Sequence, residues 1–196
     1  MTAIPGRGAI VNGDAGRTSD LLTRREFGDV ELHVEFLVPK GSNSGVYLMG
    51  RYEIQVLDSF GVERGDYPGN ECGGIYPRWL GGKNVGGRSP RVNASRPAGE
   101  WQSFDIVFRA PRFDGQGRKI ANARFVTARH NGVLVHEDAE VTGPTRAARF
   151  EDETEERPVG PLQLQGDHGP VAYRNLRIRP LRLDDGSAPS GNTPDQ

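Results

Sequence analysis

The chain has 196 residues, 26% of them charged, and a formal net charge of −1. This balance gives no electrostatic reason to expect a nucleic acid or an anionic membrane as partner. A chain of about 200 residues suits a single domain, because two separate cores would be cramped. The 27 glycines and 14 prolines follow no Gly-X-Y period, so they indicate many turns rather than collagen.

Cys72 is the only cysteine in the sequence, which excludes an intrachain disulfide and a cysteine-based metal cluster. It stands in Asn70-Glu71-Cys72-Gly73-Gly74, and we interpret it as a small residue in a turn rather than a nucleophile. No segment approaches the roughly eighteen apolar residues of a membrane span. The first residues also lack the basic end and apolar stretch of a secretory signal. We therefore expect a soluble protein.

The first strong pattern is an alternation that begins after Asp29. The apolar members are Val30, Leu32, Val34, Phe36 and Val38, and the polar members between them are Glu31, His33 and Glu35. A period of two predicts a strand with one face in a core and the other in water. In a second strand, over residues 52–57, Tyr52, Ile54 and Val56 share a face, so Glu53 and Gln55 point the other way.

Further strands are predicted at 46–49, 101–109, 123–129, 133–136, 162–165 and 171–181. Asn131-Gly132 lies between two of them and is a strong hairpin signal, since both turn residues need a positive φ. A short acidic helix is expected at 147–156. Many short strands separated by turns predict an all-β fold, a concanavalin-like jelly-roll β-sandwich of two antiparallel sheets. We expect one domain over residues 1–183 and a disordered tail over 184–196.

Polar side chains collect at the outward positions of these strands. They are Glu31, His33, Glu35, Tyr47, Glu53, Gln55, Gln163 and Gln165. Carboxylates and amides suit sugar hydroxyls, and Tyr76, Trp79 and Trp101 offer flat surfaces on which a sugar ring can stack. For Glu31 and His33 an ordinary solvated face is the preferred interpretation. For Glu53 and Gln55 we favour a sugar site, because the Asn43-Ser44-Gly45 loop and Asp58 gather polar groups around one strand end.

The spacing Glu53-x-Gln55-x-x-Asp58 bears on the type of chemistry. Laminarinase-type retaining glycosidases carry Glu-x-Asp-x-x-Glu at such a strand, whereas this chain has Gln and Asp at the last two positions. A retaining double displacement needs two carboxyl groups about 5–5.5 Å apart. The shorter Asp58 side chain therefore counts against a laminarinase-like glycosidase.

His168 lies in Gln165-Gly166-Asp167-His168-Gly169-Pro170, directly after a predicted strand. A histidine in a short glycine-bounded loop is exposed enough to titrate and held well enough to be oriented. Histidine is the usual general base near neutral pH. A turn histidine bonded within its own loop is an equally good interpretation.

Several segments together resemble the 3-keto-disaccharide hydrolase domain family. They are Asn43-Ser44-Gly45-Val46-Tyr47-Leu48, Gly50-Arg51-Tyr52-Glu53-Ile54-Gln55-Val56-Leu57-Asp58-Ser59, Gly74-Ile75-Tyr76, Gly99-Glu100-Trp101, Asn131-Gly132, Gly160-Pro161-Leu162-Gln163-Leu164-Gln165-Gly166-Asp167-His168-Gly169 and Tyr173-Arg174-Asn175-Leu176. The resemblance covers about residues 24–182, in family order. The usual Leu-Gln-Asp-His of the family is extended here by Gly166.

The resemblance implies cleavage of glycosides that carry a ketone at the third sugar carbon. It places Glu53, His168 and Asp58 in catalysis, with Glu53 or His168 as base and acid. The substrate-binding residues that we expect are Asn43, Tyr47, Arg51, Gln55, Tyr76, Trp101, Gln165 and Asn175. A divalent cation would stabilise an enolate, and Glu53, Asp58 and His168 are suitable ligand types, but their spacing does not decide whether a metal is used. Relatives of this family are often exported, which leaves the compartment open.

Three functions remain open at this point. The first is a hydrolase acting on 3-keto-glycosides. The second is a carbohydrate-binding module without catalysis, because this sandwich hosts many lectins and a fold does not fix a function. The third is a laminarinase-like glycosidase. A binding module has no use for a poised His168 beside Glu53, so these two titratable residues separate the first hypothesis from the second.

Overall fold

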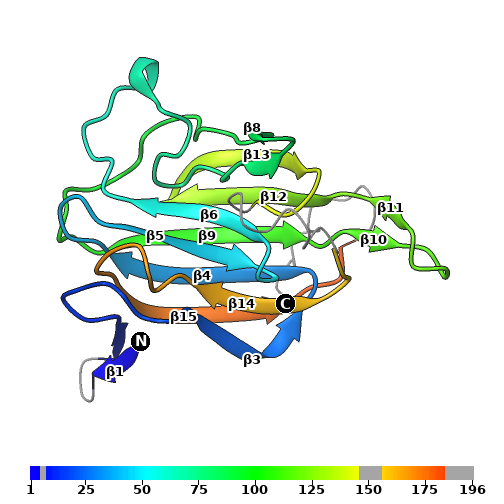
Figure 1. Cartoon of the computed structure of the whole chain (residues 1–196), viewed down its shortest axis with the longest axis horizontal. Helices are drawn as coiled ribbons and strands as arrows, with labels where there is room; N and C mark the ends of the chain where they lie inside the picture. Colours follow the sequence, from blue (N-terminus) through cyan, green and yellow to red (C-terminus); the bar gives the residue numbers. More distant parts are fainter. Residues whose placement is uncertain (5–7, 146–155, 184–196) are drawn as a thin grey trace, which may run out of the picture.

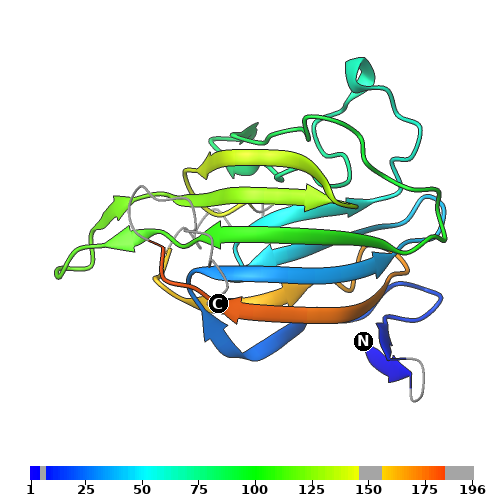
Figure 2. The same cartoon turned by 180° about the vertical axis from the view of Figure 1, so that it is seen from behind.

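The computed structural model describes residues 1–4, 8–145 and 156–183, and its main feature is two β-sheets packed face to face (Figures 1 and 2). The seven-stranded sheet has the order β1 (Thr2–Ile4), β2 (Ala9–Val11), β15 (Ala172–Pro180), β4 (Val30–Leu37), β9 (Gln102–Arg109), β12 (Ala123–His130) and β13 (Val133–Val141). The four-stranded sheet has the order β3 (Leu21–Phe27), β14 (Gly160–Leu164), β5 (Asn43–Leu48) and β6 (Tyr52–Leu57). All these pairs are antiparallel.

The remaining elements are small. Two-stranded sheets are formed by β7 (Arg78–Leu80) with β8 (Lys83–Val85) and by β10 (Arg112–Phe113) with β11 (Lys119–Ala121), and Arg64–Asp66 form the 3₁₀ helix η1. The predicted all-β sandwich of two antiparallel sheets is confirmed. No helix among the described residues is long and apolar enough to cross a membrane. The predicted tail at 184–196 lies outside the described residues, as does nearly all of the predicted helix at 147–156, and the single-domain organisation stays a prediction.

The core lies between the sheets and follows the predicted alternation. Every apolar residue predicted to face inward on β4 is buried, as are Tyr52, Ile54 and Val56 of β6 and Phe104, Ile106 and Phe108 of β9. The aromatic rings pack in contact, with the Phe36 and Phe104 centroids 4.6 Å apart. Tyr173 of β15 crosses the core, and its hydroxyl lies 2.8 Å from Ser44 Oγ of β5. This contact joins the two sheets at the strand end where the polar residues gather.

Two turns set the register of the strands around this core. Asn131 and Gly132 both have positive φ, 51° and 80°, so the hairpin that the sequence predicts is present. The turn between β5 and β6 differs from expectation, because Met49, predicted as the end of a strand, has a φ of 56° and forms the turn with Gly50. β5 instead begins earlier, at Asn43. This shift places Asn43 opposite Leu57 and Gly45 opposite Gln55.

Two buried histidines hold neighbouring segments together: His136 contacts the segment that precedes β7, and His130 of β12 contacts β9. The His136 Nε2–H donates to the Gly73 carbonyl at 2.7 Å, and the His130 Nε2–H donates to Gln102 Oε1 at 2.8 Å. Burial lowers the pKa of each imidazole to about 4, helped by Arg96 at His130 and by Arg88 and Arg91 at His136. Both histidines are therefore neutral in the folded protein at pH 7.

We predict that acid destabilises the fold through these two histidines. An unfolded imidazole binds its proton near pH 6.5, so the unfolded state binds more protons between about pH 6.5 and 4. The free energy of unfolding has its full value above that window. It decreases as the pH falls through the window, by on the order of 2–3 kcal/mol per histidine. Urea unfolding of His136→Gln, which keeps a donor for Gly73, should lose less stability between pH 7 and 4.5 than the wild type. Equal losses would contradict the prediction.

Candidate functional site

The site is built on the outer face of the four-stranded sheet, away from the core. Because Tyr52, Ile54 and Val56 enter the core, the pleat turns Glu53 and Gln55 of β6 to the opposite face. Both side chains are nonetheless nearly inaccessible, with 3% and 1% of their surface exposed. They point away from the apolar interior that Tyr52, Ile54 and Val56 enter.

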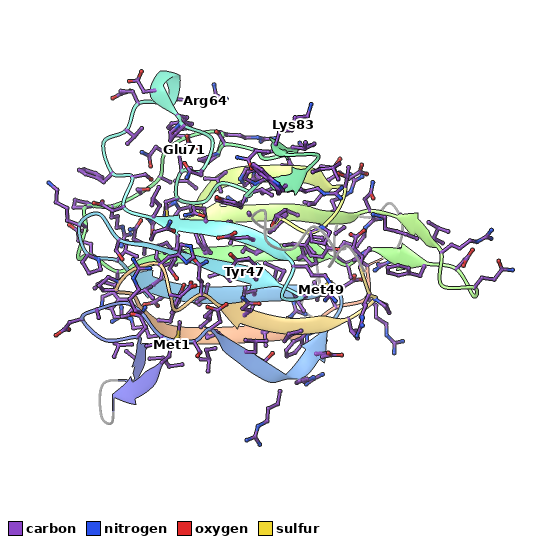
Figure 3. The ribbon with its side chains drawn as sticks, in the orientation of Figure 1. Met1, Tyr47, Met49, Arg64, Glu71 and Lys83 are labelled. Atoms are coloured by element: carbon purple, nitrogen blue, oxygen red, sulfur yellow. The ribbon has the colours of Figure 1, made fainter. Side chains whose placement is uncertain are left out.

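Gly45 of β5 makes room for the Glu53 carboxylate. A Cβ atom at this position would lie 2.3 Å from Glu53 Oε1 and 3.0 Å from Tyr47 Cε2. Any side chain at residue 45 would therefore displace the carboxylate, which lies across the bare backbone of β5. Tyr47 stands next along the same strand, over the middle of the four-stranded sheet (Figure 3). A glycine inside a strand often marks a place where another group approaches the backbone closely, and Gly45 is such a glycine.

Amide side chains on the same face as Glu53 fix one another. Gln55 Nε2 donates to Asn43 Oδ1 at 2.6 Å, and Gln165 Nε2 donates to the Tyr47 hydroxyl at 3.3 Å. The backbone N–H of Gln165 also donates to the Gly45 carbonyl at 2.9 Å, which continues the pairing of β14 with β5. Asn43, Tyr47, Gln55 and Gln165 thus share one sheet face with Glu53. Such groups can donate to and accept from hydroxyls.

Residues 73–76, near the end of the long connection between β6 and β7, pair with β6 and extend this sheet. The Gln55 N–H donates to the Gly74 carbonyl at 2.8 Å, and the Tyr76 N–H donates to the Glu53 carbonyl at 3.1 Å. Burial raises the pKa of the Tyr76 phenol, and the charge of Glu53 raises it further. The phenol is therefore a protonated donor at neutral pH, close enough to Glu53 to sense its charge.

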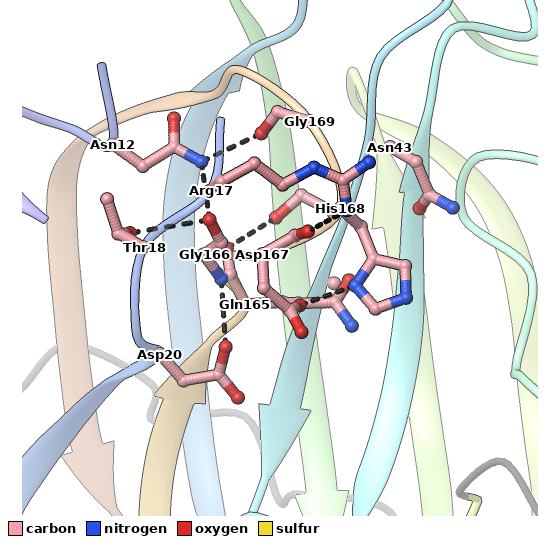
Figure 4. Close-up of polar contacts among 12 residues, drawn as sticks. Asn12, Arg17, Thr18, Asp20, Asn43, Gln165, Gly166, Asp167, His168 and Gly169 are labelled. Atoms are coloured by element: carbon pink, nitrogen blue, oxygen red, sulfur yellow. Dashed lines mark hydrogen bonds and ion pairs between the residues drawn. The ribbon is translucent and has the colours of Figure 1, made fainter. Parts of the chain in front are cut away.

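His168 lies in the loop between β14 and β15, and a clamp from the start of the chain holds that loop (Figure 4). Asn12 Nδ2 donates to the Gly166 and Gly169 carbonyls at 2.9 and 2.7 Å, and the Val171 N–H donates to Asn12 Oδ1 at 2.8 Å. On the other side of the loop, the Gly166 N–H donates to Asp20 Oδ1 at 2.9 Å. The loop is therefore fixed by hydrogen bonds to its backbone and is not free to swing.

The imidazole itself is half exposed and has a carboxylate partner. His168 Nδ1 contacts Asp167 Oδ1, and 46% of the histidine side chain is accessible. Gly169 packs against Asn43, since a Cβ at Gly169 would lie 3.0 Å from the Asn43 nitrogen. In Figure 4 the His168 ring lies on the side of the loop that faces Asn43. The loop thus brings His168 to the Asn43 end of the face that carries Glu53.

The other predicted residues of this face have structural contacts. Asp58 Oδ2 accepts the Gly41 N–H at 2.9 Å, which ties the end of β6 to the turn before β5. Arg51 Nη1 donates to the Met49 carbonyl at 3.0 Å, and the Arg51 carbonyl accepts the Thr145 N–H at 2.8 Å. Trp79 lies in the small sheet of β7 and β8.

Trp101 and Asn175 do not lie on this face, and their predicted role in the site is corrected. Asn175 Nδ2 donates to Glu35 Oε1 at 2.7 Å, and the Arg174 guanidinium stacks over Trp101 at 3.9 Å. Both contacts are on the outer face of the seven-stranded sheet. Glu31, His33 and Glu35 of β4 also lie there, so the outward polar residues predicted from sequence belong to two opposite faces. Alternation shows that a residue faces outward but does not show from which sheet.

Comparison with known proteins places this geometry in a family. Residues 4–179 match the family model described as a 3-keto-alpha-glucoside-1,2-lyase-like domain. The chain belongs to this family. Comparison with curated proteins gives no match.

Three solved structures from Parabacteroides distasonis, each described as a "putative glycosyl hydrolase", are similar to the lyase-like domain. The first is 31% identical, with a TM-score of 0.65 over 83% of this chain and 68% of that protein. The second is 23% identical, with a TM-score of 0.60 over 89% and 88%. The third is 16% identical, with a TM-score of 0.55 over 89% and 81%. The last two likenesses concern the fold alone, and the first agrees with a carbohydrate-active function.

The residues suggested for a metal in this lyase-like domain do not form a cluster. Among the described residues, no group of three or more His, Cys, Asp or Glu side chains could hold a metal ion. Asp58 is bonded to the Gly41 amide and His168 to Asp167, so neither is arranged with Glu53 as a ligand set. We therefore assign no step to a metal.

Sequence reasoning missed the residues that hold the site from a distance. Asn12, Asp20 and Thr145 come from segments without a strong hydrophobic pattern. The side chain of each forms a hydrogen bond with the backbone of a residue distant in the sequence. Gly45 was noted only as part of a loop. Its position between Ser44 and Val46, both of which face the core, was the one available signal, because a glycine at an outward strand position implies a close approach.

We predict that Gly45→Ala displaces Glu53. The new methyl group would meet Oε1 at 2.3 Å, so the carboxylate must move, at a cost of about 1–3 kcal/mol for overpacking. A crystal structure should show the carboxylate shifted, and thermal unfolding should show a lower Tm. Gly115→Ala is the matched control, because a Cβ there meets nothing within 4 Å. An unmoved Glu53 with an unchanged Tm would contradict the role given to Gly45.

Proposed function

We propose that this chain cleaves glycosides whose sugar carries a ketone at the third carbon, by elimination across the first and second carbons followed by addition of water. The family description, a 1,2-lyase-like domain for 3-keto-alpha-glucosides, supports the substrate class and the elimination. The observation that carries the proposal is the Glu53 carboxylate held over Gly45 among amides and phenols. This arrangement suits a base beside a bound sugar.

The chemistry explains why a single base suffices. A ketone at the third carbon acidifies the hydrogen on the second carbon, so a base can remove it as a proton. The electron pair left behind forms an enolate and then the double bond between the first and second carbons, as the bond to the glycosidic oxygen breaks. The leaving oxygen takes a proton and departs as an alcohol. Water then adds across the new double bond and gives the free 3-keto sugar, so the net reaction is hydrolysis.

We assign Glu53 as the base and His168 as the group that delivers a proton to the leaving oxygen. Glu53 is fixed by its position over Gly45, and a base must be held within hydrogen-bond reach of the proton that it removes. His168 is half exposed at the end of the same face, where the departing sugar would leave. Histidine can exchange protons near neutral pH. The Asp167 carboxylate contacts Nδ1 of His168, so Nε2 points away from Asp167.

The remaining residues have roles in binding. Gln55, Gln165 and Asn43 would bind hydroxyl groups of the sugar through their amides. The Tyr47 and Tyr76 hydroxyls are the donors for the oxygen on which negative charge develops, since burial keeps the Tyr76 phenol protonated. Asp58 and Arg51 support the strand ends rather than the substrate.

We predict that the two catalytic residues respond differently to the leaving group. Glu53→Gln should lower kcat about 10²–10⁴-fold for both p-nitrophenyl 3-keto-α-glucoside and a 3-keto-disaccharide, because the base is lost. His168→Ala should spare the p-nitrophenyl compound, whose leaving group needs no proton, and slow the disaccharide by a similar factor. The measurements are p-nitrophenol release and chromatography of the freed sugars.

Glu137→Gln is the matched control, because Glu137 is an exposed carboxylate paired with Arg91 and should leave both rates unchanged. Wild-type exchange of the hydrogen on the second carbon in D₂O should disappear in Glu53→Gln and persist in His168→Ala. If both variants kept wild-type turnover, the assignment would be wrong. If the wild type bound both oxidised and native disaccharides without turnover, the protein would be a carbohydrate-binding module instead.

A further inference from the structure

The outer face of the seven-stranded sheet carries ordered rows of charged residues. In Figure 2 this sheet faces the viewer, with β15, β4, β9 and β12 side by side. Arg177 pairs in register with His33, His33 with Asp105, and Asp105 with Arg129. These four residues therefore form one row across four strands, with an arginine at each end. They lie on the opposite side of the sandwich from Glu53.

The neighbouring rows are neutralised within themselves. Arg179 pairs with Glu31, and Arg174 Nε lies 2.6 Å from Glu35 Oε2. In the central row, His33 Nδ1 lies 2.6 Å from Asp105 Oδ1. Each of these carboxylates thus has a cationic or imidazole partner.

The two arginines at the ends of the central row differ from the rest. Within the described parts of the chain, neither Arg177 nor Arg129 is paired with a carboxylate. Arg129 Nη1 donates only to the Gly132 carbonyl, at 3.2 Å. Both guanidiniums are on exposed residues. An arginine presents several N–H donors in a fixed fork that matches carboxylate geometry.

A groove of about 520 Å³ runs over this row. Its lining includes Arg177 and Arg129 at the two ends, His33 and Asp105 between them, and Thr127, which lies beside Arg129 on β12. Counting Arg179 and Glu31, which also line it, three guanidiniums face two carboxylates. The groove therefore has a surplus of positive charge in a chain whose net charge is −1.

We propose that this groove binds an acidic oligosaccharide, with one sugar carboxylate on Arg177 and another on Arg129. Three strand spacings separate the two arginines, which is about 14 Å between their Cα atoms. Every unit of a uronic acid chain carries one carboxylate. Two carboxylates a few units apart in a chain laid across the strands can therefore reach both arginines. Asp105 between the arginines and Thr127 beside Arg129 offer carboxylate and hydroxyl oxygens to the sugar hydroxyls. The site is separate from the proposed cleavage site and does not depend on it.

The dimensions and charge favour a small acidic ligand over a macromolecule. A groove of this volume falls in the range of small-molecule sites, whereas a stable protein interface buries at least about 1,000 Å². Nucleic-acid sites are strongly basic over a wide surface, and here the neighbouring rows are neutralised by Glu31 and Glu35.

The test is calorimetric titration of the full chain with hexagalacturonate at low salt, with cellohexaose as the neutral probe. The double variant Arg129→Gln/Arg177→Gln should lower the affinity for hexagalacturonate about tenfold or more, because two charge-assisted contacts are lost. Arg118→Gln removes one exposed positive charge from the β10–β11 hairpin and should change the affinity less than about twofold. Glu53→Gln should bind as the wild type does. Equal Tm values would show that all variants are folded.

Four results would overturn the proposal. Two concern the wild type: no binding of hexagalacturonate, or equally tight binding of cellohexaose. The third is full affinity in the double variant, and a change in its sedimentation would then point to contact between two copies of the chain. The fourth is a loss of affinity in Glu53→Gln as large as in the double variant, which would place the ligand in the cleavage site.

Discussion

The candidate site depends on the pleat of β6. Tyr52, Ile54 and Val56 are buried in the core. Because successive side chains of a strand point to opposite faces, Glu53 and Gln55 face outward. Glu53 then needs space beside β5, and Gly45 supplies it by having no side chain. A strand slipped by one residue would put the carboxylate into the apolar interior, where an unpaired charge is very costly. The packing of the core and the position of Glu53 are therefore one constraint.

Much of the fold could be read from the sequence because strand alternation is a local signal. The inward residues of β4, β6 and β9 were each marked by period two, and the hairpin at Asn131 by its own turn chemistry. The assignment of a strand to a sheet is not local. Glu35 and Glu53 have similar patterns around them, yet β4 and β6 belong to different sheets and their carboxylates face opposite sides of the molecule. Trp101 and Asn175, which were expected in the site from their residue types and the family resemblance, lie with Glu35 on the other outer face.

The outer faces of the two sheets differ in how their charges are satisfied. On the face that carries Glu53, the amides of Asn43, Gln55 and Gln165 and the Tyr47 hydroxyl bond to one another. On the seven-stranded sheet, carboxylates and guanidiniums pair across strands, and an exposed pair such as Arg179 with Glu31 contributes little to stability. A neutral, crowded face is suited to chemistry on one ring, and a charged, open face is suited to contact along a chain.

Asn12 connects parts of the chain that are far apart in sequence, since its hydrogen-bond partners are 154 to 159 residues away. Contacts of such separation form late, because closing a long loop costs entropy before any contact rewards it. The backbone around His168 can therefore become ordered only after the last strand has joined the sheet beside β2. The two strands that flank His168, β14 and β15, are interior strands of the two sheets rather than edge strands. Neither sheet can therefore be completed on the ribosome until these late-made strands have emerged.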